Sequence, residues 1–414
     1  MKSKRRVVIT SLGIVSSIGI GIEDFWNANI NGVSGISRVD NFDTAHFGSK
    51  ISGQIKQFKP ELFIAEDIVK RTDRFVHLGL VSALLAFKDA PWLLEEDKHR
   101  TGVIFGSGLG GILFHEEQLL RGYEKGAHRL NPLCVPKITP NAVSSHVAIN
   151  LKLGGPNFVV ANACASGTNA VGEAFRKIQN GDADVMVAGG AEAPLTEFTF
   201  GAYDAMRVLS RRNEEPEKAS RPFDRQRDGF VIAEGGAVLI LEELESALKR
   251  NSRIYAEVIG YAANSGAYHM VMPDPSGADI AQVMRSVLSD ACILPADIDY
   301  INAHGTSTVQ NDRVETKAIK EVFGERARFI PVSSTKSALG HSIGASGAIE
   351  ACVCALVLDR QIIPPTINCT DPDPECDLDY VTAGCRPGAY TTVLSNSFGF
   401  GSNNACLILR RYNG

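Results

Sequence analysis

One cysteine stands where a strand is expected to run directly into a helix. Cys164 lies in the segment VVANACASGT, in which β-branched residues give way to small residues and then to a helical pattern. This places the sulfur near a helix N-terminus, where the helix dipole and free N–H groups favour a thiolate and can hold an oxyanion. A lone cysteine is more often an inert core residue. Cys164 is therefore a candidate nucleophile, with a structural role as the alternative.

Two histidines favour the nucleophile hypothesis. His304 ends a predicted strand and is followed by the hydroxyl-rich turn GTST, and His341 follows a glycine in the segment SSTKSALGHS. A single histidine is more often structural, but both of these lie in glycine-flanked turns at strand ends in a chain with only nine histidines. Lys336 precedes His341 closely and can supply a fixed positive charge.

A zinc site is the competing interpretation of the same residues. Zinc needs a third and a fourth ligand with a recognisable second shell, and the spacing of cysteines and histidines supplies none. We therefore expect a covalent thiol enzyme without a metal.

A dinucleotide site is a weaker alternative. The segment 106–111, GSGLGG, follows a predicted strand and matches G-x-G-x-x-G. A dinucleotide-binding unit also needs a second strand and an acid about 20 residues further on, whereas a proline-containing loop at 131–136 follows here. The glycines are better explained by close approach of backbone to backbone, which disfavours an NAD-dependent oxidoreductase.

The elements that must position these residues alternate between strands and helices. Short runs rich in Val and Ile alternate with longer segments of helical period, which predicts α/β layers with buried, largely parallel strands. The predicted strands are 6–10, 101–105, 157–161, 185–188, 237–241 and 329–332, and the predicted helices are 165–179, 278–290, 314–323 and 347–360. One buried strand in each half ends at a candidate catalytic residue, Cys164 or His304, which permits a duplicated fold.

Composition excludes several classes of protein. The chain has 414 residues, 44% hydrophobic and 21% charged, with a formal net charge of −5. This is ordinary globular composition, and the mild acidity disfavours a nucleic-acid binder. No apolar run reaches the ~18 residues of a membrane span. Nine cysteines without zinc-finger spacing argue against a disulfide scaffold and favour a reducing cytoplasm.

Four separated motifs resemble those of the β-ketoacyl-acyl-carrier-protein (ACP) synthases, in that family's order and spacing. They are ACASG at 163–167, NAHGTST at 302–308, STKS with the later GH at 334–341, and NSFGFG at 396–401. The resemblance covers essentially the whole chain and is closest to synthase II. The chain also resembles the ketosynthase-alpha subunits of type II polyketide synthases.

The resemblance implies a thiolase-like α/β fold, normally dimeric. Two halves related by a pseudo-twofold axis would form five layers, α-β-α-β-α. We place the halves at 1–255, with the nucleophilic cysteine and surface insertions, and at 256–414, with the two histidines.

The resemblance also implies a role for each motif residue. Cys164 would accept an acyl group from ACP, with the backbone N–H groups of Cys164 and Phe400 as the oxyanion hole. His304 and His341 would each offer one N–H to the enolate oxygen of malonyl-ACP. Lys336 would support the histidine pair, with Glu315 as its counter-charge.

Further residues are expected to contact the substrate. Thr306 and Thr308 would hydrogen-bond the phosphopantetheine arm, and Phe400 would gate the acyl pocket. Pocket positions are also expected at Leu109, Leu133, Cys134 and Val271. Synthase II enzymes commonly have two Phe residues where this chain has Leu133 and Cys134, and Val271 stands where Thr or Ser often contacts pantetheine. We hypothesise that the smaller side chains admit a longer or stiffer acyl chain, unless bulk from a partner subunit compensates.

The expected activity is decarboxylative Claisen condensation of a Cys-bound acyl group with malonyl-ACP, in fatty-acid or type II polyketide synthesis. The partners expected are ACP and a second ketosynthase-like subunit, in a homodimer or a heterodimer with a chain-length factor. No separate cofactor, membrane or nucleic acid is expected. A non-catalytic chain-length factor is disfavoured, because such subunits typically lack the cysteine. Pathway and acyl chain length stay open.

Overall fold

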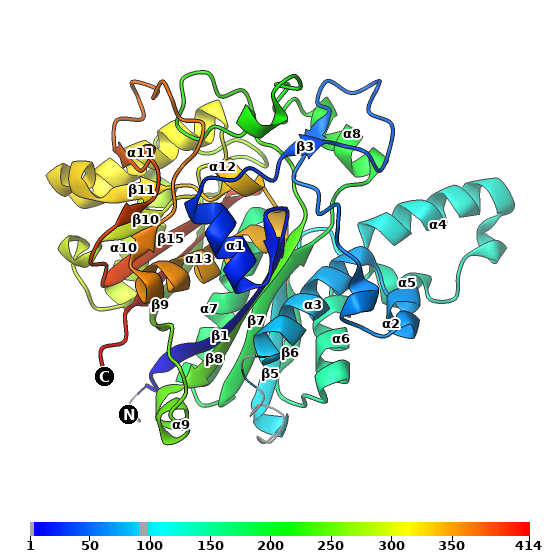
Figure 1. Cartoon of the computed structure of the whole chain (residues 1–414), viewed down its shortest axis with the longest axis horizontal. Helices are drawn as coiled ribbons and strands as arrows, with labels where there is room; N and C mark the ends of the chain where they lie inside the picture. The colour runs from blue at the N-terminus through cyan, green and yellow to red at the C-terminus, as the bar shows by residue number, and fades with distance from the viewer. Residues whose placement is uncertain (1–3, 89, 91–97) are drawn as a thin grey trace.

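The computed structural model describes residues 4–88, 90 and 98–414. Within those ranges, no helix has both the length and the apolar character needed to cross a membrane. The main strands form one sheet in the order β13-β11-β10-β15-β16-β9-β1-β8-β7-β5-β6, with the short β2 (Gly19–Ile20) at the side of β1. Figure 1 shows its two halves on either side of a central pair of helices.

The N-terminal half of the sheet contains five principal strands. In chain order they are β1 (Val7–Ser16), β5 (Thr101–Gly106), β6 (Asn157–Val160), β7 (Val185–Glu192) and β8 (Gly235–Glu243). The spatial order β6-β5-β7-β8-β1 has two parallel pairings, β6 with β5 and β5 with β7. The pairings of β7 with β8 and of β8 with β1 are antiparallel.

The C-terminal half repeats this arrangement. Its strands are β9 (Ala256–Ser265), β10 (Tyr300–Asn302), β11 (Pro331–Ser333), β15 (Thr392–Gly399) and β16 (Asn403–Arg410), with β13 (Asp379–Tyr380) at the edge. The spatial order β11-β10-β15-β16-β9 has parallel pairings at the first two contacts and antiparallel pairings at the last two. Because strand order and direction both repeat, the fold is duplicated.

Helices cover both halves and fill the space between them. The central pair is α7 (Ser166–Gln179) and α13 (Ser346–Arg360). The outer helices are α3 (Arg74–Lys88) and α6 (Ala142–Leu151) on one side, and α10 (Ala278–Asp290) and α11 (Val309–Phe323) on the other. Figure 1 shows these layers, which give the five-layered thiolase-like architecture. Shorter helices are α1 (Ile22–Ile30), α2 (Glu66–Arg71), α4 (Ile112–Lys125), α5 (Cys134–Ile138), α8 (Glu197–Ala205), α9 (Leu244–Lys249) and α12 (Lys336–Leu339).

The expectation of largely parallel strands is wrong, because the sheet is mixed. In the N-terminal half, β5 is parallel to both of its neighbours, β6 and β7, whereas β8 is antiparallel to β7 and to β1. The C-terminal half repeats this pattern. Both kinds of strand are buried on two faces, so both read as continuous apolar runs. The hydrophobic pattern therefore reports burial and leaves strand direction undetermined.

The first strand is also longer than predicted. The predicted strand ends at residue 10, but β1 continues through Gly13 to Ser16. A Cβ at Gly13 would lie 2.0 Å from the carbonyl oxygen of Ser82 on α3. That glycine is needed because helix and strand approach closely, and no turn forms there.

The duplication relates Cys164 to a glycine. In each half a 3₁₀ turn directly precedes the central helix, and the turns are Ala163–Ala165 and Ile343–Ala345. Their first residues, Ala163 and Ile343, have φ of 48° and 45°. Position 164 therefore corresponds to Gly344. The strands that lead to Cys164 and His304 are not equivalent to each other, because β10, which leads to His304, corresponds to β5 and not to β6.

Candidate active site

The nucleophile candidate is held in the turn before α7. The Ser166 hydroxyl accepts a hydrogen bond from Asn162 N–H and donates one to the carbonyl oxygen of Ala163, at 2.8 and 2.7 Å. Small residues are required here, because a Cβ at Gly167 would lie 2.6 Å from the backbone nitrogen of Ala348 on α13. The close packing of the two central helices thus places Cys164 where both halves meet.

The structure brings His341 to the sulfur. His341 Nε2 lies 3.0 Å from Cys164 Sγ, and His341 Nδ1 lies 2.9 Å from the Ser346 hydroxyl on α13. The ring also packs edge-on against Phe230, with centroids 5.3 Å apart. The Ser346 hydroxyl at Nδ1 and the Phe230 ring beside the imidazole fix its orientation, so that Nε2 faces the sulfur.

His304 completes the group from the other side. Its ring centroid lies 5.5 Å from that of His341, with the planes nearly perpendicular at 87°. Ligand atoms of Cys164, His304 and His341 all lie within 4.8 Å of one another. The tertiary structure therefore brings together three candidates that are separated by up to 177 residues in sequence.

Lys336 fixes the tautomer of His304. Its ammonium lies 3.4 Å from His304 Nδ1 and donates a 2.7 Å hydrogen bond to the His304 carbonyl oxygen. An ammonium can only donate, so Nδ1 accepts and the imidazole proton resides on Nε2. Burial and the charge of Lys336 hold the pKa values of His304 and His341 well below their usual range. Both rings are therefore neutral at pH 7.

This tautomer also decides between a metal and an oxyanion site. Cys164, His304 and His341 supply three possible ligands, which sequence spacing had not revealed. A metal needs an unprotonated nitrogen with a free lone pair, but Lys336 keeps the proton of His304 on Nε2. The Nε2–H group of His304, close to the Cys164 sulfur, is therefore better suited to donating to a developing oxyanion than to binding a metal ion.

The predicted counter-charge of Lys336 is wrong. Lys336 forms its ion pair with Glu350 of α13, and both side chains are almost fully buried. Glu315 instead accepts the backbone N–H groups of His304 and Gly305, at 2.9 and 2.8 Å. Glu350 lies in the buried part of α13, residues 346–358, which contains no other charged residue. A single acid in such a segment is the sequence signal that could have identified it.

The expectation that Cys164 rests as a thiolate is also wrong. Burial raises the pKa of the Cys164 thiol to about 11, while the Lys336 charge and a hydrogen bond from Phe400 N–H lower it less. The sulfur therefore holds its proton at pH 7. His341 Nε2 is the base placed to accept that proton as the sulfur attacks.

Phe400 N–H is directed at the sulfur, as the predicted oxyanion hole requires. The preceding Gly399 makes this approach possible, because a Cβ there would lie 3.0 Å from Asn162 O and 3.1 Å from Cys164 N. The turn is tied to the next loop by the hydrogen bond from Gly401 N–H to Met270 O, at 2.7 Å. The C-terminal half thus supplies a backbone donor next to the Cys164 sulfur.

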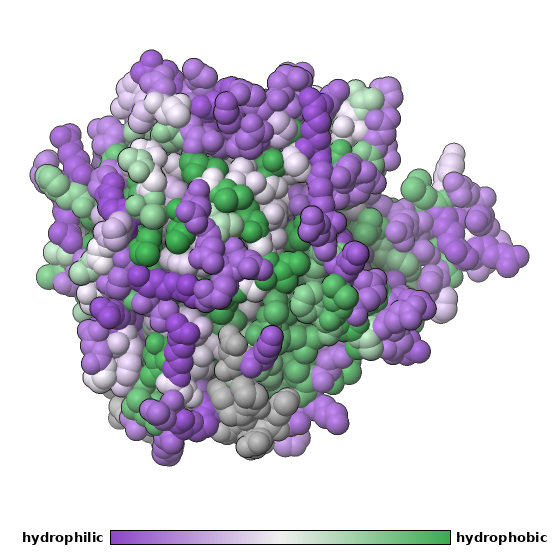
Figure 2. Space-filling model, in the orientation of Figure 1, coloured by the Kyte–Doolittle hydropathy of each residue, from purple (hydrophilic) through white to green (hydrophobic). Residues whose placement is uncertain are grey.

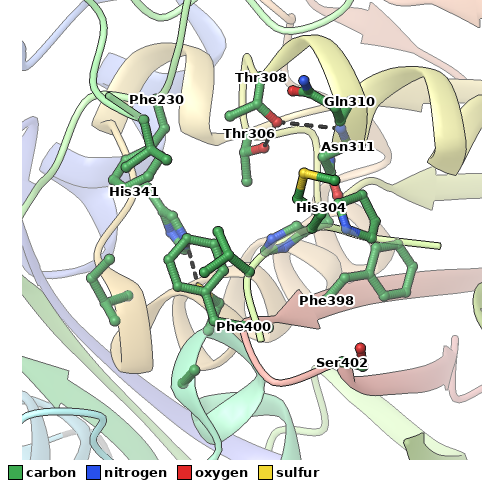
Figure 3. Close-up of a pocket in the computed structure, with 18 of the residues that line it drawn as sticks. Phe230, His304, Thr306, Thr308, Gln310, Asn311, His341, Phe398, Phe400 and Ser402 are labelled. Carbon is green, nitrogen blue, oxygen red and sulfur yellow. Dashed lines mark hydrogen bonds between the residues drawn. The ribbon is translucent and has the colours of Figure 1, made fainter. Parts of the chain in front are cut away.

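A cavity of about 330 Å³ opens onto the reacting groups. Figure 3 shows Phe230 and His341 on one side, and Thr306, Thr308 and Gln310 on another. The Thr306 and Thr308 hydroxyls lie 3.0 Å apart, and Thr308 also caps α11 by accepting Asn311 N–H. Hydroxyl groups therefore line the route to the sulfur.

The remaining predicted pocket residues divide into two groups. Val271 and Phe400 line the cavity together with the threonines. Leu109, Leu133 and Cys134 do not line this cavity of the single chain. Leu109 N–H donates to Glu192, and this hydrogen bond holds the glycine loop away from the cavity. Leu133 and Cys134 lie at the start of α5, on an arm that projects from the body.

Sequence inspection missed several residues that shape the site. They are Glu350, Ser346, Phe230, Tyr203 and Glu192. The buried Glu192 carboxylate accepts N–H groups from Gly108 and Gly344, at 2.6 and 3.0 Å, and so connects the glycine loop to the turn after His341. Burial raises the pKa of Glu192 to about 7.

Similar proteins agree with this geometry. Residues 4–247 match the family description "Beta-ketoacyl synthase, N-terminal domain" and residues 255–370 match "Beta-ketoacyl synthase, C-terminal domain". The chain is 43% identical to the 3-oxoacyl-(acyl-carrier-protein) synthase 2 of Synechocystis, over 99% of both chains. It is 44% identical to the protein of the same name from Coxiella burnetii, again over 99% of both.

Solved structures show the same fold. A type II polyketide synthase acyl-carrier protein in complex with its hexaketide-bound ketosynthase superposes with a TM-score of 0.91 at 36% identity, over 99% of this chain and 100% of that one. A β-ketoacyl synthase from Burkholderia phymatum gives 0.92 at 33% identity over the same shares. The thiol, the two neutral imidazoles and these full-length likenesses agree: the chain is an acyltransferase of the β-ketoacyl synthase family.

Proposed function

We propose that this enzyme joins an acyl group held on Cys164 to a malonyl unit, and that both substrates arrive as thioesters of ACP. The observation that carries the proposal is the convergence of Cys164, His304 and His341 within 4.8 Å at the end of a cavity lined by hydroxyl groups. A thiol beside two neutral N–H donors can capture an acyl group and then stabilise an enolate.

In the first step, Cys164 takes the acyl group from its carrier. The sulfur attacks the thioester carbonyl as His341 accepts the thiol proton, and the backbone N–H groups of Cys164 and Phe400 stabilise the oxyanion. The carrier thiolate leaves with that proton, and a Cys164 thioester remains. Losing such an oxyanion donor costs about 10²–10³ in rate.

In the second step, malonyl-ACP replaces the released carrier. Its thioester carbonyl accepts the Nε2–H group of His304 while the carboxylate leaves as CO₂, and the bonding electrons become an enolate. Once Cys164 is acylated, His341 no longer faces a thiol proton, so its neutral ring can carry its proton on Nε2, with Nδ1 accepting the Ser346 hydroxyl, and donate to the same oxygen. The enolate carbon attacks the Cys164 thioester. A carbon–carbon bond forms, the Cys164–acyl bond breaks, and the sulfur leaves as a thiolate that takes a proton from solvent, which restores the thiol.

The carrier arm is the substrate element that fits the cavity entrance. Thr306 and Thr308 line the same cavity as Cys164 and would supply two hydroxyls for the amides of a phosphopantetheine chain. Val271 faces the same space with an apolar side chain. The reaction needs no cofactor beyond the arm that carries the substrates. Since Cys164 acts as a thiol, we place the enzyme in the reducing cytoplasm.

A second ketosynthase-like subunit is the other proposed partner. The arm formed by α4 and α5 projects from the body (Figure 1) and exposes apolar side chains, among them Leu120, Tyr123 and Val135. Figure 2 shows hydrophobic surface gathered at the base of this arm. Contiguous exposed apolar surface marks association sites. Leu133 and Cys134 lie on this arm, so they would reach an acyl pocket only across a dimer interface.

Two assemblies fit this surface. One is a homodimer, and the other is a heterodimer in which this chain is the catalytic subunit beside a chain-length factor. The second is favoured by a likeness to the ishigamide ketosynthase/chain length factor, with a TM-score of 0.91 at 33% identity. Cys134→Phe tests whether the arm closes an acyl pocket: a shift to shorter products supports it, and an unchanged product distribution removes it.

Intact-mass spectrometry tests the proposed reaction directly. Wild-type protein mixed with acyl-ACP should gain one acyl group on Cys164, and addition of malonyl-ACP should discharge it as a product two carbons longer. Cys164→Ser should show neither mass change. A wild-type protein that gains no acyl group from any chain length would overturn the proposal.

A further inference from the structure

One polar group in the cavity has no role in the reaction described above. Tyr203 of α8 lines the cavity beside the nucleophile. Its phenol hydroxyl forms no hydrogen bond with any residue of the described ranges, and it is open to solvent. The hydroxyl therefore borders open space in the cavity that the ring lines.

Ring contacts place this phenol on the nucleophile side of the cavity. The Tyr203 ring packs edge-on against Phe230, with centroids 5.9 Å apart, and Phe230 packs in the same way against His341. His341 in turn contacts Cys164. Figure 3 shows Phe230 and His341 away from Thr308 and Gln310, where the carrier arm would enter. An acyl chain on Cys164 would therefore extend towards Tyr203.

The surroundings of the phenol are mostly apolar. The side chains packed around it include Val208, Phe230 and Ile343, and the charged or ionisable groups near it are the Cys164 thiol and the buried Glu192 carboxylate, which already accepts four N–H or O–H groups. Burial raises the pKa of Tyr203 well above its usual range, so the hydroxyl keeps its proton. Water can bind the hydroxyl in the empty cavity, so the cost of an unpaired donor arises only when an acyl chain displaces that water. A ligand oxygen that accepted this hydrogen bond would remove the cost.

We propose that Tyr203 selects acyl chains that carry a keto or hydroxyl oxygen over saturated chains of the same length. The proposal rests on the proposed function, since it requires an acyl group on Cys164. A saturated chain would surround the hydroxyl with methylene groups and leave it unpaired, whereas an oxygenated chain would accept its hydrogen bond. Discrimination against a missing polar partner is stronger than discrimination by apolar shape.

The test compares acylation rates of Cys164 by intact-mass spectrometry. The probes are octanoyl-ACP and a set of oxo-octanoyl-ACP isomers that place the ketone at successive carbons. Wild-type protein should react faster with at least one isomer than with octanoyl-ACP. Tyr203→Phe should slow that isomer roughly tenfold, the effect of one hydrogen bond in such a site, and should raise the octanoyl rate, because the phenyl ring has no hydroxyl to leave unpaired.

Tyr412→Phe is the matched control, because Tyr412 lies near the C-terminus away from the cavity. It should change none of the rates. Equal wild-type rates for all probes, or a Tyr203→Phe variant that slows every probe alike, would overturn the selection. Failure of every probe to acylate Cys164 would instead overturn the proposed function, and the selection with it.

Discussion

The ammonium of Lys336 lies 3.4 Å from Nδ1 of His304, close enough to keep the imidazole proton on the opposite nitrogen. The Nε2–H group of His304 is thereby committed to donating. Lys336 itself is held by Glu350 in the layer between the two sheet halves. The charge that organises the histidine pair is therefore anchored in the core of the fold, outside the cavity.

The two histidines should separate the two steps. His304→Ala should still accept an acyl group on Cys164, because His341 holds the thiol, but should lose condensation by about 10²–10³. His341→Ala should slow both steps, since it also removes the base 3.0 Å from the sulfur. Single-turnover measurements of acylation and of chain extension distinguish the variants. Equal loss of acylation in both would contradict the assignment.

Breaking the buried ion pair should destabilise the protein. Glu350→Ala leaves Lys336 charged and unpaired in the core, and we expect a loss of about 3–5 kcal/mol in the free energy of unfolding. The matched control is Glu321→Ala, which removes an exposed partner of Arg285 and should cost no more than about 1 kcal/mol. Denaturant unfolding measures both. Comparable losses in the two variants would show that the buried pair of Lys336 and Glu350 contributes no more to stability than an exposed ion pair.

Reactivity of Cys164 should depend on pH unlike that of an ordinary thiol. Its pKa of about 11 means that the thiolate fraction keeps rising through pH 8–10, whereas a free cysteine levels off near its pKa of about 8.5. The iodoacetamide rate at Cys164 should therefore climb about tenfold per pH unit in this range. Lys336→Met should lower the rate further, because the nearby positive charge favours the thiolate. A plateau beginning below pH 8 would indicate a thiolate–imidazolium pair instead.

Gly399 should tolerate no side chain. Gly399→Ala puts a Cβ 3.1 Å from Cys164 N, which pushes the end of β15 and Phe400 N–H away from the sulfur. We expect acylation to fall about 10- to 100-fold with little change in thermal midpoint. Gly122→Ala serves as the control, since the nearest atom to its Cβ is a side-chain carbon of Leu130 at 3.3 Å. Normal acylation by Gly399→Ala would remove the requirement.

The sequence determined the parts of this protein that depend on local pattern and on motif. Strand 157–161 leading through Cys164 into a helix, the ends of helix 278–290, and the histidine turns after predicted strands are all present. These features follow from apolar periodicity and from small residues at sharp turns, which act over a few neighbouring residues. The resemblance of the motifs identified the family for the same reason.

Which distant groups meet depends on how the elements pack, and no stretch of sequence shows it. Strand direction depends on connections rather than on burial, so the mixed sheet was not visible in the apolar runs. The partner of Lys336 depends on how α13 packs, and that packing gives it Glu350 instead of Glu315. The thiol pKa depends on desolvation, which outweighs the helix N-terminus that the sequence suggested. Charge pairing and burial depend on residues that are far apart in the sequence, so no local pattern could predict them.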